Sequence, residues 1–257
     1  MRGVKKPINP DEAPRPVFVL AEHYDPLEGP WHVHRRAQLI HASEGVLTVR
    51  TDEGLWVVPP QRAVWVLPGV RHQISSRRGF WLRTLYAEPG ALPLPPRCCV
   101  VAVDRLVHEL LIAASGFGPG YPTEGPEARL IQVIIDRLPP LAVAPLHLPQ
   151  PQDVRVRRIA DLLVKDPADA RTLEDFAGKV GVTARTAARL FLKETGLTFG
   201  QWRQQLRLLV ALEKLGEGES VSSVALDVGY QDVSSFIAAF KAALGETPAR
   251  YFRQGAG

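Results

Sequence analysis

The sequence predicts a two-domain protein in which a small β-barrel is followed by an all-α domain. Short segments rich in Val and Trp, bounded by Gly, Pro or Asp, occupy residues 17–86. Repeated short strands of this kind are typical of a sandwich or small barrel. From Asp153 onward, apolar residues instead recur at helical spacing. The chain has 257 residues, of which 46% are hydrophobic, so each domain can bury a core.

The first domain begins after a polar arm. Residues 1–16 contain lysines but no apolar stretch behind them, which predicts a flexible arm rather than a secretory signal. We assign the barrel to residues 17–97, because the proline-rich segment 87–97 interrupts regular structure. The clearest predicted strands lie at 46–50, 55–58 and 63–67.

Two amphipathic helices are expected after the barrel, in the segment 98–138. Residues 103–114 and 126–138 each carry an apolar stripe, and Pro126 suits a first helical position. These helices either pack on the barrel or form a dimer. The following segment, 139–152, is rich in proline and is expected to be a semi-rigid linker, which places a domain boundary near residue 150.

The C-terminal domain, 153–257, contains the same segment twice. Residues 172–202 align with residues 220–251, with a one-residue slip in the turn after the glycine of each copy. Each copy predicts a helix, a glycine turn and a second helix, at 173–194 and 221–243, which is the helix-turn-helix pattern. The aligned pairs include Phe176 with Val224, Gly181 with Gly229, Phe191 with Phe240, Gly196 with Gly245 and Trp202 with Tyr251.

Capping residues support this reading of the helices. Thr172 and Thr198 each precede an acid or amide by three residues, as in a capping box. Ser220 and Asp232 stand where N-caps are needed, and a glycine follows several helix ends. We predict helices at about 153–165, 173–180, 184–194, 199–215, 221–228, 233–243 and 248–253.

The repeated segment resembles the DNA-binding domain of AraC-type bacterial transcription regulators, the AraC/XylS family. The most diagnostic stretch is VSSVALDVGYQDVSSFIAAFKAALGETPARYF, residues 221–252. The resemblance implies a sequence-specific transcription regulator, an activator or repressor in the bacterial cytoplasm. It also implies a homodimer that binds double-stranded DNA and contacts RNA polymerase. Both recognition helices are then expected to enter successive major-groove segments of one duplex.

Both expected recognition helices offer candidate DNA contacts. Arg185 and Arg189 lie four residues apart, hence on one face, and can reach guanine edges or phosphates. On the second helix, the face of Val233, Ser234 and Ala238 has no long donor, so it should contribute less hydrogen-bonded readout. The alternative is that the basic residues form an ordinary solvated face. For Arg203 and Arg207 on the linking helix the choice stays open, with surface charge as the default. The candidate DNA-binding residues are Thr183, Arg185, Thr186, Arg189, Val233, Ser234, Ser235, Ala238 and Lys241; Thr183, Ser235 and Lys241 suit phosphate contact.

The first domain carries a second constellation. His32, His34 and Gln38 are evenly spaced, and His72 follows a later turn. This pattern resembles the two-part cupin signature, in which histidines and an acid converge on a metal inside a β-barrel. Gln38 stands where the cupin acid is expected. The resemblance implies either a site for zinc, nickel or iron, or a metal-free pocket for a small-molecule effector.

These observations favour a non-enzymatic regulator that senses an effector. The family resemblance implies that it controls a neighbouring efflux or metabolic gene. A metal-dependent cupin enzyme with an added helical domain is the alternative, but no further acid–base constellation supports it. A non-specific DNA-binding protein is disfavoured, since residues 153–257 contain 15 Lys and Arg against 13 Asp and Glu. Adjacent Cys98 and Cys99 suit a reducing cytosol, and no apolar run is long enough for a membrane span.

Overall fold

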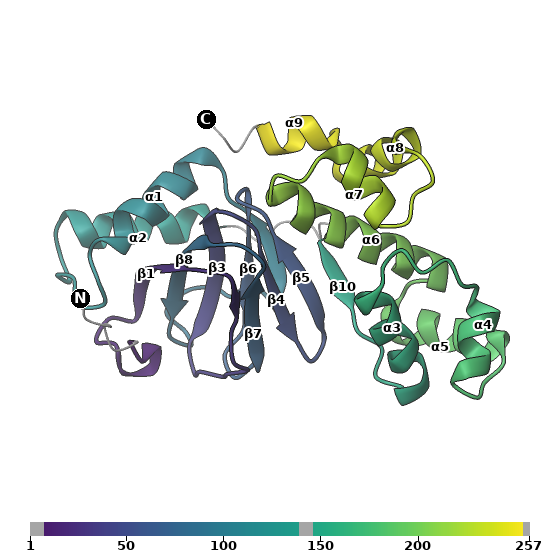
Figure 1. Ribbon diagram of the computed structural model, residues 1–257. Helices are drawn as coiled ribbons and strands as arrows, with labels where there is room; N and C mark the ends of the chain where they lie inside the picture. The colour runs from purple at the N-terminus through teal and green to yellow at the C-terminus, as the bar shows by residue number, and fades with distance from the viewer. Residues whose placement is uncertain (1–7, 139–145, 254–257) are drawn as a thin grey trace. The chain divides into compact units, whose positions relative to one another are not determined.

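The computed structural model describes residues 8–138 and 146–253, and its contacts divide the chain into two compact units (Figure 1). The first unit comprises residues 1–49 and 58–143. The second comprises residues 50–57 and 144–257, so one short segment of the predicted barrel groups with the helical part of the chain.

Two antiparallel sheets build the first unit. The first sheet has the strand order β1-β8-β3-β6-β9, and the second contains the order β4-β7-β2. Side chains alternate along β3 and β8, so that Gln38 and Tyr86 face one side of the sheet and Leu39 and Leu85 the other. The strands are β1 (Val17–Tyr24), β2 (Leu27–Glu28), β3 (Ala37–Glu44), β4 (Leu47–Thr51), β6 (Arg62–Val66), β7 (His72–Ser76), β8 (Phe80–Ala87) and β9 (Cys99–Ala102).

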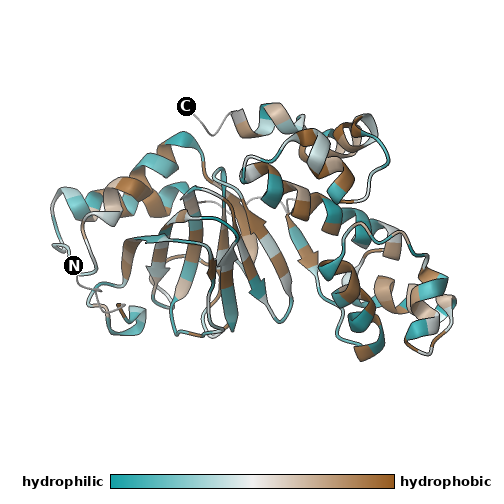
Figure 2. Ribbon diagram, viewed as in Figure 1, coloured by the Kyte–Doolittle hydropathy of each residue, from teal (hydrophilic) through white to brown (hydrophobic). Residues whose placement is uncertain are grey.

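Helices α1 (Arg105–Ser115) and α2 (Pro126–Arg137) cover one face of the first sheet. Figure 2 shows hydrophobic residues along both helices. Their buried residues, among them Leu111 and Ile134, join the core of that sheet. The predicted helices are confirmed, but the start of the segment 98–138 is not helical, because Cys99–Ala102 pairs with β6 as strand β9.

Residues 8–16 are held in place rather than loose, unlike the flexible arm predicted for 1–16; residues 1–7 lie outside the described part. A short 3-10 helix, η1 (Pro10–Glu12), begins at an Asn9 cap. The Asp11 carboxylate accepts two hydrogen bonds from the Arg35 backbone N–H. Arg36 is 2% exposed, and its side chain donates to the carbonyl oxygens of Ala13, Arg15 and Pro16.

The second unit contains seven helices among its described residues, together with one pair of strands. The helix boundaries agree with the sequence prediction to within about one residue, because capping residues and glycines mark them. The helices are α3 (Val154–Lys165), α4 (Leu173–Lys179), α5 (Ala184–Thr195), α6 (Phe199–Gly216), α7 (Val221–Asp227), α8 (Val233–Leu244) and α9 (Pro248–Arg253). Strands β5 (Gly54–Val58) and β10 (His147–Pro149) pair antiparallel, so part of the predicted linker is a strand.

The caps of the second unit show how local chemistry sets its helices. Thr172 and Thr198 each form a full capping box, with Asp175 and Gln201 respectively. Gly196 ends α5 and Gly245 ends α8, both in the left-handed conformation that favours glycine. The two copies therefore share the glycine that ends their second helix.

Aromatic side chains form the core of each helix-turn-helix unit. In the first copy Phe191 packs against Phe199 and Trp202, and all three are buried. In the second copy Phe240 packs edge-on against Phe236 and Tyr251. This common anchoring fixes which face of each second helix points outward.

Candidate functional site

Helix α5 presents its basic residues outward. Arg185 and Arg189 are exposed, whereas Ala187, Leu190 and Phe191 are buried against the rest of the unit. The structure thus places both arginines on the accessible face, as the sequence predicted. Such a face can offer guanidinium groups to base edges or phosphates.

Two threonines form the N-terminal cap of α5. The Thr183 hydroxyl oxygen accepts a hydrogen bond from the Thr186 backbone N–H at 3.2 Å. The two threonine hydroxyls also lie 3.0 Å apart. Both candidate residues therefore already form the helix cap. A phosphate at this end of α5 would meet two hydroxyl groups that already make hydrogen bonds within the cap.

Helix α8 presents a smaller and less polar face. Ser234, Ala238 and Lys241 are exposed, and Val233 is half-buried. The Ser235 hydroxyl donates to the Asp232 carboxylate at 2.7 Å, and the Ser235 backbone N–H donates to the same group at 2.8 Å. These bonds hold the pKa of Asp232 below its usual value. A negative charge therefore sits at the start of α8, where α5 has a neutral threonine.

Helix α6 ties the two copies together through an arginine. Arg207 donates from Nε to the Pro167 carbonyl oxygen at 2.9 Å and from Nη1 to the Gly229 carbonyl oxygen at 3.1 Å. Arg203 donates to the Arg171 carbonyl oxygen and lies over the Phe199 ring. Our expectation of simple surface charge was wrong for both, since they are half-buried structural ties.

The segment before α3 is fastened to both α5 and α6. The Glu194 carboxylate accepts hydrogen bonds from the backbone N–H groups of Gln152 and Asp153 at 2.7 and 2.8 Å. Trp202 donates from Nε1 to the Pro149 carbonyl oxygen at 2.8 Å. The glycine at Gly54 is required on the facing strand, because an added Cβ would lie 2.6 Å from the Leu148 carbonyl oxygen.

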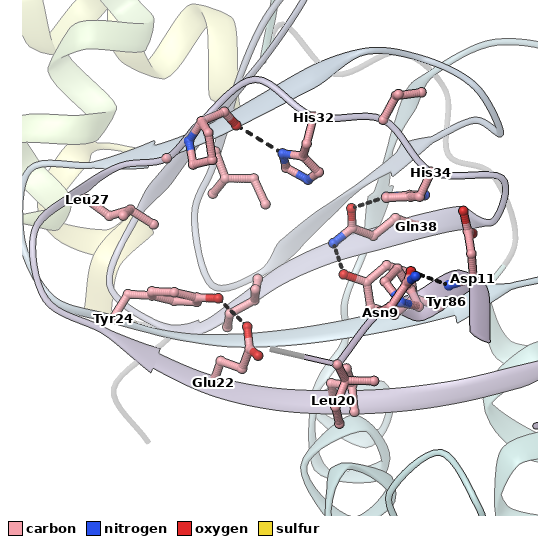
Figure 3. Close-up of a pocket in the computed structure, with 17 residues that line it drawn as sticks. Asn9, Asp11, Leu20, Glu22, Tyr24, Leu27, His32, His34, Gln38 and Tyr86 are labelled. Atoms are coloured by element: carbon pink, nitrogen blue, oxygen red, sulfur yellow. Dashed lines mark hydrogen bonds between the residues drawn. The ribbon is translucent and has the colours of Figure 1, made fainter. Parts of the chain in front are cut away.

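The first unit contains a cavity of about 430 Å³, a size suited to a small molecule. Figure 3 shows Glu22 and Tyr24 on one side of it and the histidines with Gln38 on the other. Much of the remaining wall is apolar, as in most ligand pockets. Its apolar lining includes Ile8, Leu20, Leu27, Val33, Ile74 and Leu82.

Three histidines cluster as the sequence predicted, and two of them, His32 and His34, line this cavity, although neither lies on a regular strand. One ring nitrogen of each histidine lies within 4.8 Å of the corresponding atoms of the other two. His32 and His72 are joined by an isolated β-bridge. Each ring directs Nδ1 at a backbone carbonyl oxygen: His32 at Pro30 (3.0 Å), His34 at Arg36 (2.7 Å) and His72 at Val70 (2.9 Å).

These carbonyls determine where the protons are. A carbonyl oxygen only accepts, so a neutral imidazole places its single proton on Nδ1 and leaves a lone pair on Nε2. The Nε2 atoms of His34 and His72 lie 3.0 and 2.9 Å from Gln38 Oε1, which is also electron-rich. Burial, with the neighbouring histidines, lowers the pKa of His72 to about 4, which keeps it neutral. This donor set fits a divalent transition metal ion.

A second histidine pair was missed by the sequence reasoning. The sequence pattern suggests no role for His41 or His108, yet His41 Nε2 lies 3.2 Å from His108 Nδ1. His41 Nδ1 is bonded to the Arg62 carbonyl oxygen, and burial lowers the pKa of His41 to about 4. Because one histidine lies on β3 and the other on α1, no sequence spacing could have revealed the contact.

Two further findings concern residues outside the candidate sites. Cys98 and Cys99 form no disulfide, and burial raises the pKa of the Cys99 thiol, which favours its less reactive protonated form. Among the described residues, no helix is both long enough and apolar enough to cross a membrane.

Comparison with known proteins gives the same two-part division. A model of the AraC-like ligand-binding domain matches residues 15–94, and a helix-turn-helix domain model matches residues 176–254. The HTH-type transcriptional regulator NimR of Escherichia coli is 40% identical over 91% of this chain and 86% of its own length. RipA of Corynebacterium glutamicum, another HTH-type transcriptional regulator, is 39% identical over 58% of this chain and 41% of its own length.

A solved structure of ToxT from Vibrio cholerae O395 aligns with 94% of this chain and 99% of that chain, with 11% identity and a TM-score of 0.41. The assignment depends on NimR, since a relative 40% identical over most of both chains shares its family. The chain therefore belongs to the AraC-type helix-turn-helix transcriptional regulators with an N-terminal ligand-binding domain.

Proposed function

We propose that α5 supplies most of the sequence-specific DNA contacts of this regulator and that α8 supplies a weaker set. The supporting observation is the pair of exposed arginines, Arg185 and Arg189, on a helix whose opposite face is buried. On α8, Ser234 and Lys241 contact phosphate, and Val233 and Ala238 contact thymine methyl groups. Ser235 and Thr183 position their helices through their caps.

This assignment is tested on operators obtained by genome-wide DNA capture with the full-length protein. Arg185→Ala and Arg189→Ala each weaken operator binding by about 1–3 kcal/mol, the range for a base contact. Arg158→Ala on α3, an exposed arginine outside the helix-turn-helix units, is the matched control for lost charge. Footprints that are unchanged in both α5 variants reject the assignment.

We also propose that the cavity of the first unit binds the effector and that effector binding changes DNA affinity. Two conformations of the protein that differ in affinity for the ligand are sufficient to couple effector binding to DNA binding. A ligand shifts a conformational equilibrium only through such a difference in affinity. The supporting observation is a concave, largely apolar space with a few convergent polar groups. Genome-wide capture also identifies the controlled gene, which we expect to be a neighbouring efflux or metabolic gene.

A divalent ion, zinc, nickel or iron, is proposed at His32, His34 and His72, with Gln38 as a neutral fourth ligand. When bound, the ion supplies positive charge and a coordination position facing the cavity. The protein fixes the three imidazoles through their Nδ1–H bonds to backbone carbonyl oxygens. Gln38 is in turn held by Thr84 and Tyr86.

Metal analysis of the purified protein tests this site. His32→Ala and His72→Ala lose the ion, whereas His23→Ala, whose ring packs on Trp81 outside the cluster, retains it. Gln38→Glu strengthens binding, because a carboxylate is a better ligand than an amide. If no ion binds, or if both histidine variants retain it, the cluster is a metal-free part of the effector pocket.

The remaining partners follow from the family. We propose a homodimer formed through α1 and α2, where Leu106 and Val133 are 46% and 43% exposed although both helices already bury an apolar face. A dimer would bring two DNA-binding domains to the operator and raise affinity through effective concentration. We further propose contact with RNA polymerase, a location in the bacterial cytoplasm where the DNA is, and no catalytic role. Sedimentation of Leu106→Glu and Val133→Glu tests the dimer.

A further inference from the structure

The effector cavity has an unusual charge balance. Neither Lys nor Arg occurs among its described lining residues, whereas the carboxylates of Glu22 and Asp11 both line it. Asp11 is already bonded to the backbone N–H of Arg35 and is paired with that side chain. Glu22 is therefore the carboxylate most available to a ligand.

Only one oxygen of the Glu22 carboxylate accepts a hydrogen bond from a described residue. Oε2 accepts a hydrogen bond from the Tyr24 hydroxyl, and Oε1 has no hydrogen bond within the described chain. Figure 3 shows both side chains at the edge of the cavity, with Leu20 beside them. Burial and the neighbouring Glu22 raise the pKa of Tyr24, so this tyrosine remains a hydrogen-bond donor.

A ligand that fills the cavity removes water from Glu22. A buried carboxylate oxygen without a partner is costly, and a like charge beside it in a region of low dielectric is worse. No Lys or Arg among the described lining residues offers such an anion a compensating positive charge. A favourable ligand must bring N–H groups to Glu22, and a positive charge strengthens that bond.

We infer that this cavity takes a compact, mostly apolar molecule with a protonated amine or amidine, which binds Glu22, and that it rejects carboxylates of the same size. The apolar walls contact the body of the ligand. The inference rests on the proposed role of the cavity as the effector site, and it names the chemical class of that effector.

Three probes that share one ring test the inference: benzylamine, benzyl alcohol and benzoate. Their binding to the full-length, chelator-treated protein is measured by calorimetry. We expect benzylamine to bind about tenfold or more tighter than benzoate, which corresponds to at least one charge-assisted hydrogen bond. Glu22→Gln should remove this difference. Glu28→Gln, an exposed glutamate outside the cavity lining, is the matched control and should preserve it.

A second variant keeps the test informative if the Glu22→Gln protein does not fold. Tyr24→Phe leaves the carboxylate in place, so it should retain the preference for the amine. The inference is overturned if benzoate binds as well as benzylamine, if no benzylamine binds at millimolar concentration, or if Glu22→Gln keeps the preference. Operator titrations with each probe measure separately whether binding is transmitted to DNA, so the effector role can fail while the ligand class stands.

Discussion

The two helix-turn-helix copies have the same scaffold but different outward faces. Both start from capped helices and end their second helix at a left-handed glycine, and both anchor that helix through a buried phenylalanine. Yet Arg185 of α5 corresponds to Ser234 of α8, and Arg189 corresponds to Ala238. The comparison teaches that a duplicated fold can keep its stabilising residues and still divide its DNA-reading role unequally.

The largest expected difference concerns the aromatic anchors. Trp202 is fully buried and also donates to the Pro149 carbonyl oxygen, whereas its counterpart Tyr251 is half-buried. We expect Trp202→Ala to lower the free energy of unfolding by about 3–5 kcal/mol and Tyr251→Ala by about 1–2 kcal/mol. Urea unfolding of the full-length protein, followed by the helical circular dichroism signal, measures both. Equal losses would show that the second copy is anchored as firmly as the first.

The next difference lies in DNA affinity at matched positions. Arg189→Ala gives α5 the residue that α8 has at the same position, and it should cost about 1–3 kcal/mol of operator binding. Ser234→Ala on α8 should cost less than about 1 kcal/mol, because it removes one short donor. Electrophoretic mobility shifts at fixed salt give both values. A larger loss for Ser234→Ala would reverse the proposed division between the helices.

The caps should differ by a smaller amount. Thr172 belongs to a two-way capping box with Asp175, whereas the matching Ser220 accepts only from the Ser223 backbone N–H. Thr172→Ala should cost about 1–2 kcal/mol and Ser220→Ala about 0.5–1 kcal/mol of unfolding free energy. The pKa of Asp175 is lowered, chiefly by hydrogen bonds from Thr172, so its contribution is present above the unfolded pKa and is lost as the pH falls through the folded pKa.

A repeat of both denaturation series at mildly acidic pH tests that sign. The gap between Thr172→Ala and wild type should narrow as Asp175 takes up a proton, whereas the gap for Ser220→Ala should not change, since no carboxylate joins its cap. A Thr172→Ala penalty that is independent of pH would contradict the capping-box account.

The smallest effect is expected at the apolar face of α8. Val233→Ala should weaken operator binding by a few tenths of a kcal/mol, because it shortens a contact with a thymine methyl group without removing a hydrogen bond. Substituting uracil for thymine at the contacted base pair should have the same effect on the wild type and no effect on the variant. Additive losses would place Val233 away from that base.

Local signals predicted the helical unit almost completely. Thr172, Thr198 and the glycines after α5 and α8 act within a few residues of themselves, so the sequence reveals them directly. The histidines at 32, 34 and 72 were also found, because their motif has a fixed spacing along the chain.

What the sequence could not reveal depends on contacts between distant segments. Arg207 looked like surface charge, because its partners Pro167 and Gly229 lie 40 and 22 residues away. The strand β10 within the predicted linker required β5 as its partner. Glu22 was overlooked because nothing in the pattern of β1 distinguishes an acid facing a cavity from one facing solvent.

Hydroxyl-radical footprinting of the full-length protein on a captured operator tests the central claim most directly. The account predicts two protected segments per subunit on one side of the duplex, about one helical turn apart, with Arg185→Ala weakening protection in one segment only. Protection of a single segment, or of two segments on opposite sides of the duplex, would contradict the proposal that both copies read the same DNA.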